Sequence, residues 1–137
     1  MKNIKATNIL LMLALTVAFA GCTKDSSTTP TPSRDAFIGD WSVSETYTRL
    51  NYEVTVFADP TSTNGVLIRG FAGTLATDPY AGAVVSGTTI TLDSNQVIGD
   101  GLKINGSGTY SGNIITWNYT IDDGANLRHA LAIYTKK

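Results

Sequence analysis

Apolar and polar residues alternate along most of the chain after residue 37. Within residues 41–48 and again within 52–56, apolar side chains recur at every second position, with Glu45 as the exception. This two-residue period is typical of strands that have one buried and one wet face. Continued along the chain, the pattern predicts eight or nine strands, at residues 41–48, 52–56, 66–71, 83–86, 88–92, 96–98, 102–111, 114–121 and 127–136.

The joints between these segments have the composition of tight turns. Ser86-Gly87, Gly112-Asn113 and the corner at 122–124 supply Gly or Asn where positive φ is needed. No window after residue 37 has a helical stripe, although residues 34–39 have room for one short turn. Short antiparallel strands joined in sequence order fit an up-and-down β-barrel of about eight strands or, alternatively, a β-sandwich. We expect the barrel, spanning residues 37–137.

The first 21 residues have the layout of a secretion signal. Lys2 and Lys5 precede twelve mostly apolar residues, 9–20. As a helix this run would reach about 18 Å, short of the ~30 Å hydrocarbon core of a bilayer. We therefore expect the segment to be removed rather than to stay as a transmembrane anchor.

Cys22 is the only cysteine, and its flanks decide its chemistry. Phe19-Ala20-Gly21-Cys22 resembles the lipobox of bacterial lipoproteins, with Phe19 in place of the usual leucine. The resemblance implies cleavage before Cys22, a diacylglycerol thioether on its sulfur and an acylated new amino terminus, which together hold a protein firmly on a bilayer. The alternative is an ordinary signal peptide followed by a free thiol.

Residues 22–36 are the expected lipidated cysteine and tether. Residues 23–36 include seven Ser or Thr and two Pro, with no Leu, Ile, Val or aromatic residue, so they cannot bury enough apolar area to order themselves. As a coil they would span roughly 20 Å. Lys24-Asp25 resembles the start of a surface-export signal of Bacteroidota lipoproteins, but it contains a single acidic residue. Anchoring on the periplasmic face and on the outer face of the outer membrane therefore both remain possible.

Charge and cysteine usage exclude several classes of protein. From Cys22 onward, eight Lys and Arg face eleven Asp and Glu, a net charge of −3 without a basic patch. This argues against nucleic acid as a partner. No disulfide can form within the chain, so packing alone must stabilise the domain.

Phe37-Ile38-Gly39-Asp40-Trp41 resembles the Phe-x-Gly-x-Trp signature of lipocalins. The rest of the domain, ending in Ile-Tyr-Thr-Lys-Lys, is similar to small lipocalin-like (calycin-type) lipoproteins of Bacteroidota. The resemblance implies that Trp41 closes one end of the barrel beneath a cation from the last strands, Arg128 or Lys136. It also implies a barrel interior that holds one small ligand or is filled by side chains.

Gly106 and Gly108 fall on the expected inner face beside Tyr110. They either allow the strand to curve for closure, which we favour, or leave room for a ligand beside Trp117 and Tyr119. Further aromatic residues with the same two alternatives, pocket or core, are Trp41, Tyr47, Tyr52 and Tyr134.

Glu45 is in register with the apolar face of its strand. An inward carboxylate needs a partner, such as Arg69, Arg128 or His129, because an unpaired buried charge is costly. Such a pair would orient a polar group of a ligand. The alternative, equally open, is that a bulge near Tyr47 turns Glu45 to solvent.

Catalytic and metal signatures are missing from the sequence. His129 is the sole histidine, no nucleophile elbow occurs, and Asp122-Asp123-Gly124 indicates a turn rather than a calcium loop. We therefore expect neither an enzyme nor a cofactor nor a metal site. Two hypotheses remain: a lipid-anchored binding module for a small, partly apolar molecule or glycan, and an interaction protein that contacts another envelope protein through its loops at 58–65 and 77–81.

Overall fold

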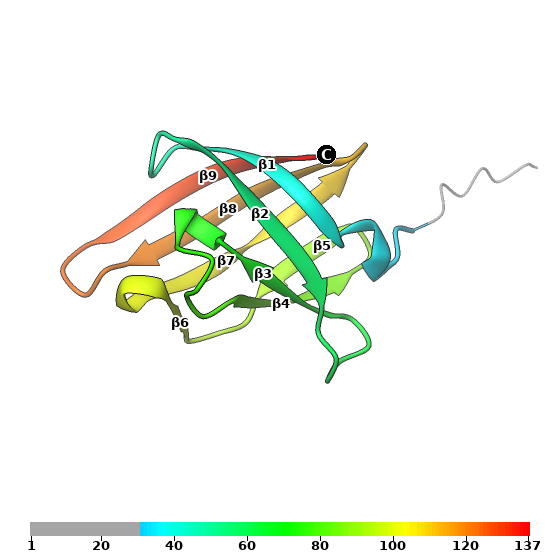
Figure 1. The fold of residues 1–137 in the computed structure, drawn as a ribbon, viewed down its shortest axis with the longest axis horizontal. Helices are drawn as coiled ribbons and strands as arrows, with labels where there is room; N and C mark the ends of the chain where they lie inside the picture. The colour runs from blue at the N-terminus through cyan, green and yellow to red at the C-terminus, as the bar shows by residue number, and fades with distance from the viewer. Residues whose placement is uncertain (1–30) are drawn as a thin grey trace, which may run out of the picture.

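The computed structural model describes residues 31–137, which form nine strands and three short 3-10 turns (Figure 1). The turns are η1 (Arg34–Ala36), η2 (Phe71–Gly73) and η3 (Gly99–Gly101). The strands are β1 (Gly39–Glu45), β2 (Asn51–Ala58), β3 (Gly65–Arg69), β4 (Ala81–Ser86), β5 (Thr89–Leu92), β6 (Gln96–Ile98), β7 (Leu102–Ser111), β8 (Ile114–Asp122) and β9 (Leu127–Lys136).

The sheet closes on itself as an antiparallel barrel. Its strand order is β5-β4-β3-β2-β1-β9-β8-β7-β6, and β5 also pairs with β7, with Ile90 opposite Gly108. Eight strands thus form the closed ring, while β6 is an extra strand on the edge of β7. The barrel predicted from the sequence is confirmed, and the β-sandwich is excluded because β5–β7 pairing leaves a single continuous sheet.

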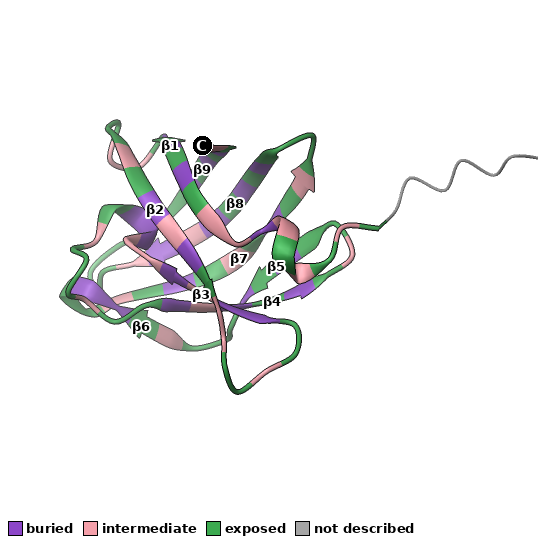
Figure 2. Cartoon of the chain, turned by 45° about the vertical axis from the view of Figure 1, so that its right-hand side comes forward, coloured by how far each residue is buried: buried purple, intermediate pink, exposed green. Residues whose placement is uncertain are grey.

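The alternating sequence pattern becomes the inner and outer faces of the barrel (Figure 2). In β1 and β8 every second residue is buried, from Trp41 to Glu45 and from Ile115 to Ile121. Two of the strands predicted from the sequence extend past the ends of the corresponding strands in the structure. β1 ends at Glu45 rather than at residue 48, and β3 ends at Arg69, because the chain turns there to place Phe71 inside the barrel.

The barrel has two ends of different construction (Figure 1). The η1 end carries η1, the 59–64 loop and the two-residue turns at 87–88 and 112–113. The η2 end carries the longer connections at 46–50, 70–80 and 123–126, together with η3. The two longest loops named from the sequence therefore lie at opposite ends and do not form one surface.

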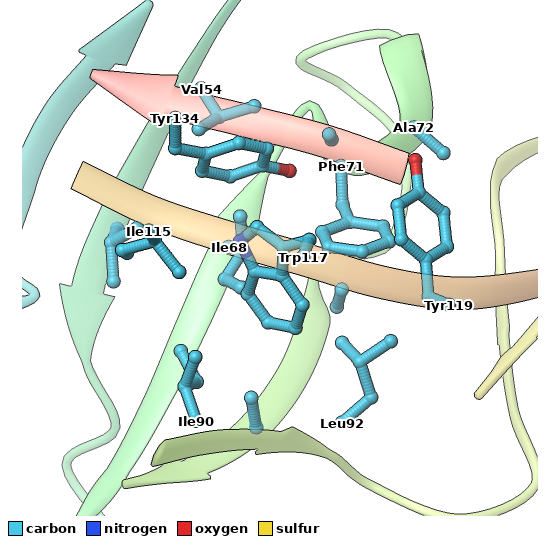
Figure 3. Packing of buried hydrophobic residues seen from close by; sticks show 14 of the residues in the cluster. Val54, Ile68, Phe71, Ala72, Ile90, Leu92, Ile115, Trp117, Tyr119 and Tyr134 are labelled. Atoms are coloured by element: carbon cyan, nitrogen blue, oxygen red, sulfur yellow. The ribbon is translucent and has the colours of Figure 1, made fainter. Parts of the chain in front are cut away.

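Side chains fill the interior between these ends. Trp117 and Ile115 from β8 lie against Ile90 of β5, and all three are fully buried (Figure 3). Gly108 makes room for them, since a Cβ there would lie 2.8 Å from Ile115 Cγ2 and 2.9 Å from Trp117 Cδ2. The glycine thus permits close packing of β7 on β8 and does not leave a void.

A hydrogen-bonded tryptophan closes the η1 end. Trp41 Nε1 donates a 2.9 Å hydrogen bond to the carbonyl oxygen of Phe37, and Lys136 Nζ lies 5.2 Å from the Trp41 ring centre. Lys136 Nζ also donates to the carbonyl oxygen of Ala36 at 2.7 Å. The choice of Arg128 as the cation over Trp41 is wrong, because Arg128 lies at the far end of β9, over the ring of Tyr47.

Among residues 31–137, no helix is long and apolar enough to cross a membrane.

Candidate functional site

Glu45 is the buried charged residue of the described core, with 6% of its surface exposed. It ends β1 on the inner face, at the η2 end of the barrel. Its Oε2 accepts hydrogen bonds from the Tyr52 hydroxyl at 2.8 Å and from the Thr48 hydroxyl at 3.2 Å. Burial raises the pKa of Glu45, and the two hydroxyl donors only partly oppose that shift.

Two tyrosines extend this polar group inward. Burial and the neighbouring Glu45 carboxylate raise the pKa of Tyr52 well above its ordinary value. Burial likewise raises the pKa of Tyr134, whose hydroxyl is close enough to Tyr52 for each to influence the other without a well-formed hydrogen bond. Both phenols therefore remain protonated, and the single hydroxyl proton of Tyr52 is already donated to Glu45 Oε2.

Four buried polar atoms in the described chain lack a hydrogen-bond partner. They are Glu45 Oε1, Trp117 Nε1, Tyr119 Oη and Tyr134 Oη. Such atoms are rare in folded proteins because each carries an uncompensated desolvation cost of about 1–3 kcal/mol. All four belong to the neighbouring strands β1, β9 and β8. Together they offer one acceptor and three donors to a polar group that would enter the barrel.

The ring of Phe71 lies among the aromatic side chains of this group (Figure 3). Its centre is 4.8 Å from that of Tyr119, 5.3 Å from that of Trp117 and 6.4 Å from that of Tyr134. Phe71 comes from η2, in the connection between β3 and β4, and not from a strand of the barrel. The aromatic side chains of β8 and β9 thus surround a ring that belongs to the β3–β4 connection at the η2 end.

The predicted cationic partners of Glu45 lie elsewhere. Arg69 is on the outer face of β3, where its Nη2 donates to Thr55 Oγ1 at 3.0 Å. His129 is exposed on the outer face of β9. Arg128 is at the surface, where its Nη2 lies 3.7 Å from Asp123 Oδ2. These three predictions are wrong because inner and outer positions alternate along a strand, and all three residues fall on outer or end positions.

Two other predicted ligand contacts also lie outside this site. Tyr47 is in the 46–50 connection beyond β1, beneath the Arg128 guanidinium. Tyr110 lies at the η1 end, with its ring 5.1 Å from that of Phe37 and its hydroxyl donating to Asn113 Oδ1. Of the predicted residues, the fold thus brings together Glu45, Trp117 and Tyr119.

The sequence reasoning did not single out Phe71 or Thr48, and it left Tyr52 and Tyr134 among the general aromatic residues. A signal for Phe71 was present, because Gly70-Phe71-Ala72-Gly73 places an apolar pair between two glycines in a loop. Thr48 carried no signal, since only the turn after β1 brings its hydroxyl back to Glu45.

Metal sites and surface hollows are the other kinds of candidate site to consider in the described residues. Residues 31–137 contain no group of three or more His, Cys, Asp or Glu side chains placed to hold a metal ion. Two surface hollows, of about 540 and 330 Å³, are formed by residues 76–80 and by Arg34 with residues 58–63. Both are open loop surfaces outside the barrel. Cys22 lies outside the described residues.

No family model matches the chain, and comparisons with curated proteins and with solved structures find no match.

Proposed function

We propose that the chain is a lipid-anchored protein of the bacterial cell envelope whose barrel binds one small, partly apolar molecule at the η2 end. The observation that carries this proposal is the set of four unpartnered buried polar atoms, three of which belong to the aromatic side chains that surround the Phe71 ring. Buried polar atoms without a partner carry a desolvation cost, and a bound molecule with matching polar groups would remove that cost.

The direction of the chain supports the same proposal. The described chain begins at residue 31 and meets the barrel through η1, at the end that Trp41 closes. A lipid on Cys22 would therefore hold the closed end towards the membrane and the η2 end away from it. A ligand arriving from the aqueous phase would meet the end at which Glu45 lies.

Native mass spectrometry of the 33–137 fragment, which contains every strand of the barrel, tests the binding proposal. The fragment is made without detergent, exposed to a small-molecule extract of the source cells and sprayed under gentle conditions. We expect one retained small-molecule mass at a ratio of one to one.

Matched variants locate the bound molecule. Trp117→Phe removes the Nε1 donor inside the barrel, whereas Phe57→Leu alters a ring on the outer face at 36% exposure. Occupancy should fall in Trp117→Phe and stay unchanged in Phe57→Leu. No retained mass, or equal retention by both variants, would contradict binding inside the barrel.

A second candidate function is supported by the apolar surface of the η2 end. Leu50 and Leu75 lie on two connections of this end, Leu127 is the first residue of β9, and the three are 66%, 71% and 65% exposed. Exposed leucines at the end away from the tether favour contact with another envelope protein. A photo-crosslinker at Leu75 should then capture a defined protein in intact cells, and a crosslinker at Val84, on the outer face of β4, should not.

A further inference from the structure

The connection between β3 and β4 contacts the barrel through two buried side chains and through Tyr80, whose ring stacks on that of Phe57. Its backbone bonds run from Gly73 N to Gly70 O, from Thr74 N to Phe71 O and from Asp78 N to Leu75 O. The Thr74 hydroxyl donates to Phe71 O, and Leu75 N donates to Asp78 Oδ2. All five bonds begin and end within the connection. Of its residues 70–80, only Phe71 and Ala72 are buried.

The backbone of this connection is strained where it enters the barrel. Ala72 has φ 55° and ψ 28°, a left-handed conformation that costs a non-glycine residue about 1–2 kcal/mol. Gly70 and Gly73 on either side have φ values of 79° and 73°. Two glycines flank a strained residue, and none of the five hydrogen bonds named above belongs to the strand ladder of the barrel.

The place that Phe71 occupies has a recognisable chemistry. Three aromatic rings surround it, and Glu45, which is in register with Trp117 across β9, has an oxygen without a partner. The donors of Glu45 also contact η2, because a Cβ on Gly73 would lie 3.3 Å from Thr48 Cγ2 and 3.9 Å from Tyr52 Cε1. Aromatic faces and a buried carboxylate are the two features that bind organic cations.

We infer that Phe71 is an internal substitute for the ligand's aromatic ring, and that the ligand is an arylalkylamine whose ammonium group binds Glu45 while its ring displaces Phe71. This inference rests on the proposed binding function. It adds the class of the ligand and the segment that must move to admit it, which is the η2 connection that carries Phe71. The ammonium donates to Glu45 Oε1 and restores the missing partner of that carboxylate. The ring takes the place between Trp117 and Tyr119, and the η2 connection swings outward.

Three probes of similar size test the ligand class on the same 33–137 fragment: phenethylamine, 2-phenylethanol and phenylacetate. The Phe71→Ala variant leaves a ring-sized space in an apolar enclosure, of the kind that takes up small aromatic molecules. By calorimetry, phenethylamine should bind Phe71→Ala at least about tenfold more tightly than 2-phenylethanol, with phenylacetate weakest. It should bind the wild type at least about tenfold more weakly than Phe71→Ala, because Phe71 must first leave.

The carboxylate is tested by a second substitution. In Phe71→Ala/Glu45→Gln the preference for phenethylamine over 2-phenylethanol should fall to within about threefold. Equal affinity for the three probes in Phe71→Ala, or a preference that survives Glu45→Gln, would overturn the cation assignment.

The displacement of Phe71 is tested on the wild type. This test therefore remains possible if Phe71→Ala does not fold. Saturating phenethylamine should speed hydrogen exchange of the Gly73 and Thr74 amides while those of β8 stay protected. Amine binding with unchanged exchange at η2 would overturn the displacement of Phe71.

These outcomes separate the two proposals. A neutral or anionic molecule retained by the wild type but lost in Trp117→Phe would leave the binding function standing and refute the amine. Failure of every probe and of the cell extract to bind would refute both.

Discussion

The Tyr52 hydroxyl donates a 2.8 Å hydrogen bond to Glu45 Oε2 and joins two adjacent strands, β1 and β2, inside the barrel. The other carboxylate oxygen has no partner, and burial raises the pKa of Glu45 above its ordinary value of 4.5. The folded state thus holds the proton of Glu45 to a higher pH than the unfolded state does.

This relationship predicts a pH dependence of stability. Because Glu45 keeps its proton above pH 4.5 in the folded chain and loses it in the unfolded chain, its contribution to the free energy of unfolding should fall as pH rises through the pKa of folded Glu45, by about 1.4 kcal/mol per unit of raised pKa. Glu45→Gln removes this loss and retains an acceptor for Tyr52. Urea unfolding of both proteins between pH 4 and 8 measures it, and a pH-independent difference between them would contradict the prediction.

A second prediction concerns the closed end. Lys136→Met keeps the apolar stem but loses the hydrogen bond to Ala36 O and the cation over Trp41, so it should lower the free energy of unfolding by about 1–2 kcal/mol. Arg128→Met is the matched control. Its pair with Asp123 is exposed and Arg128 has no hydrogen bond like that of Lys136, so losing that pair and the contact with the Tyr47 ring should cost less, at most about 1 kcal/mol. An equal or larger loss in Arg128→Met would contradict the assignment of Lys136 as the cation that stabilises the closed end.

A third prediction concerns the close approach of β7 to β8. A Cβ on Gly106, where φ is 153°, would overlap Asn118 O and Tyr119 Cβ. Gly106→Ala should therefore lose about 1–3 kcal/mol to overpacking beyond the backbone cost. Gly101→Ala, with φ 73° and open space around it, should cost only about 1–2 kcal/mol. Equal costs by thermal unfolding would mean that β7 can move away from β8.

A fourth prediction concerns the anchor. If Cys22 carries the lipid, the Cys22→Ser chain should lose labelling by a fatty-acid probe and leave the membrane fraction in cells. Ser33→Ala, in the same N-terminal region, is the control and should label normally. Undiminished labelling of Cys22→Ser would contradict the lipoprotein assignment.

Much of the fold followed from local rules in the sequence. The two-residue alternation from Trp41 onward and the glycine turns at Gly87 and Gly112 placed nine strands to within a few residues. These signals are local because the pleat of a strand and the positive φ of a turn depend only on neighbouring residues. The position of Trp41 at the closed end came instead from the resemblance of Phe-x-Gly-x-Trp to the lipocalin signature, and the contacts of Trp41 agree with it.

Local rules of this kind predicted only part of the candidate site. Glu45 was marked by its place on an apolar face, but its partners were sought among cations, and the fold supplied the hydroxyls of Tyr52 and Thr48. Partner choice depends on strand register and on the path of a turn. Neither leaves a periodic trace in the sequence.

The sequence by itself determined an all-β chain of short antiparallel strands, and it left open whether the Glu45 carboxylate faces inward or outward. Only the tertiary structure decided that β5 pairs with β7, that Lys136 rather than Arg128 covers Trp41, and that Phe71 fills the space beside Trp117. The reason is physical: alternation is set within a strand, whereas closure, end contacts and a loop side chain folded inward depend on contacts between residues far apart in the chain.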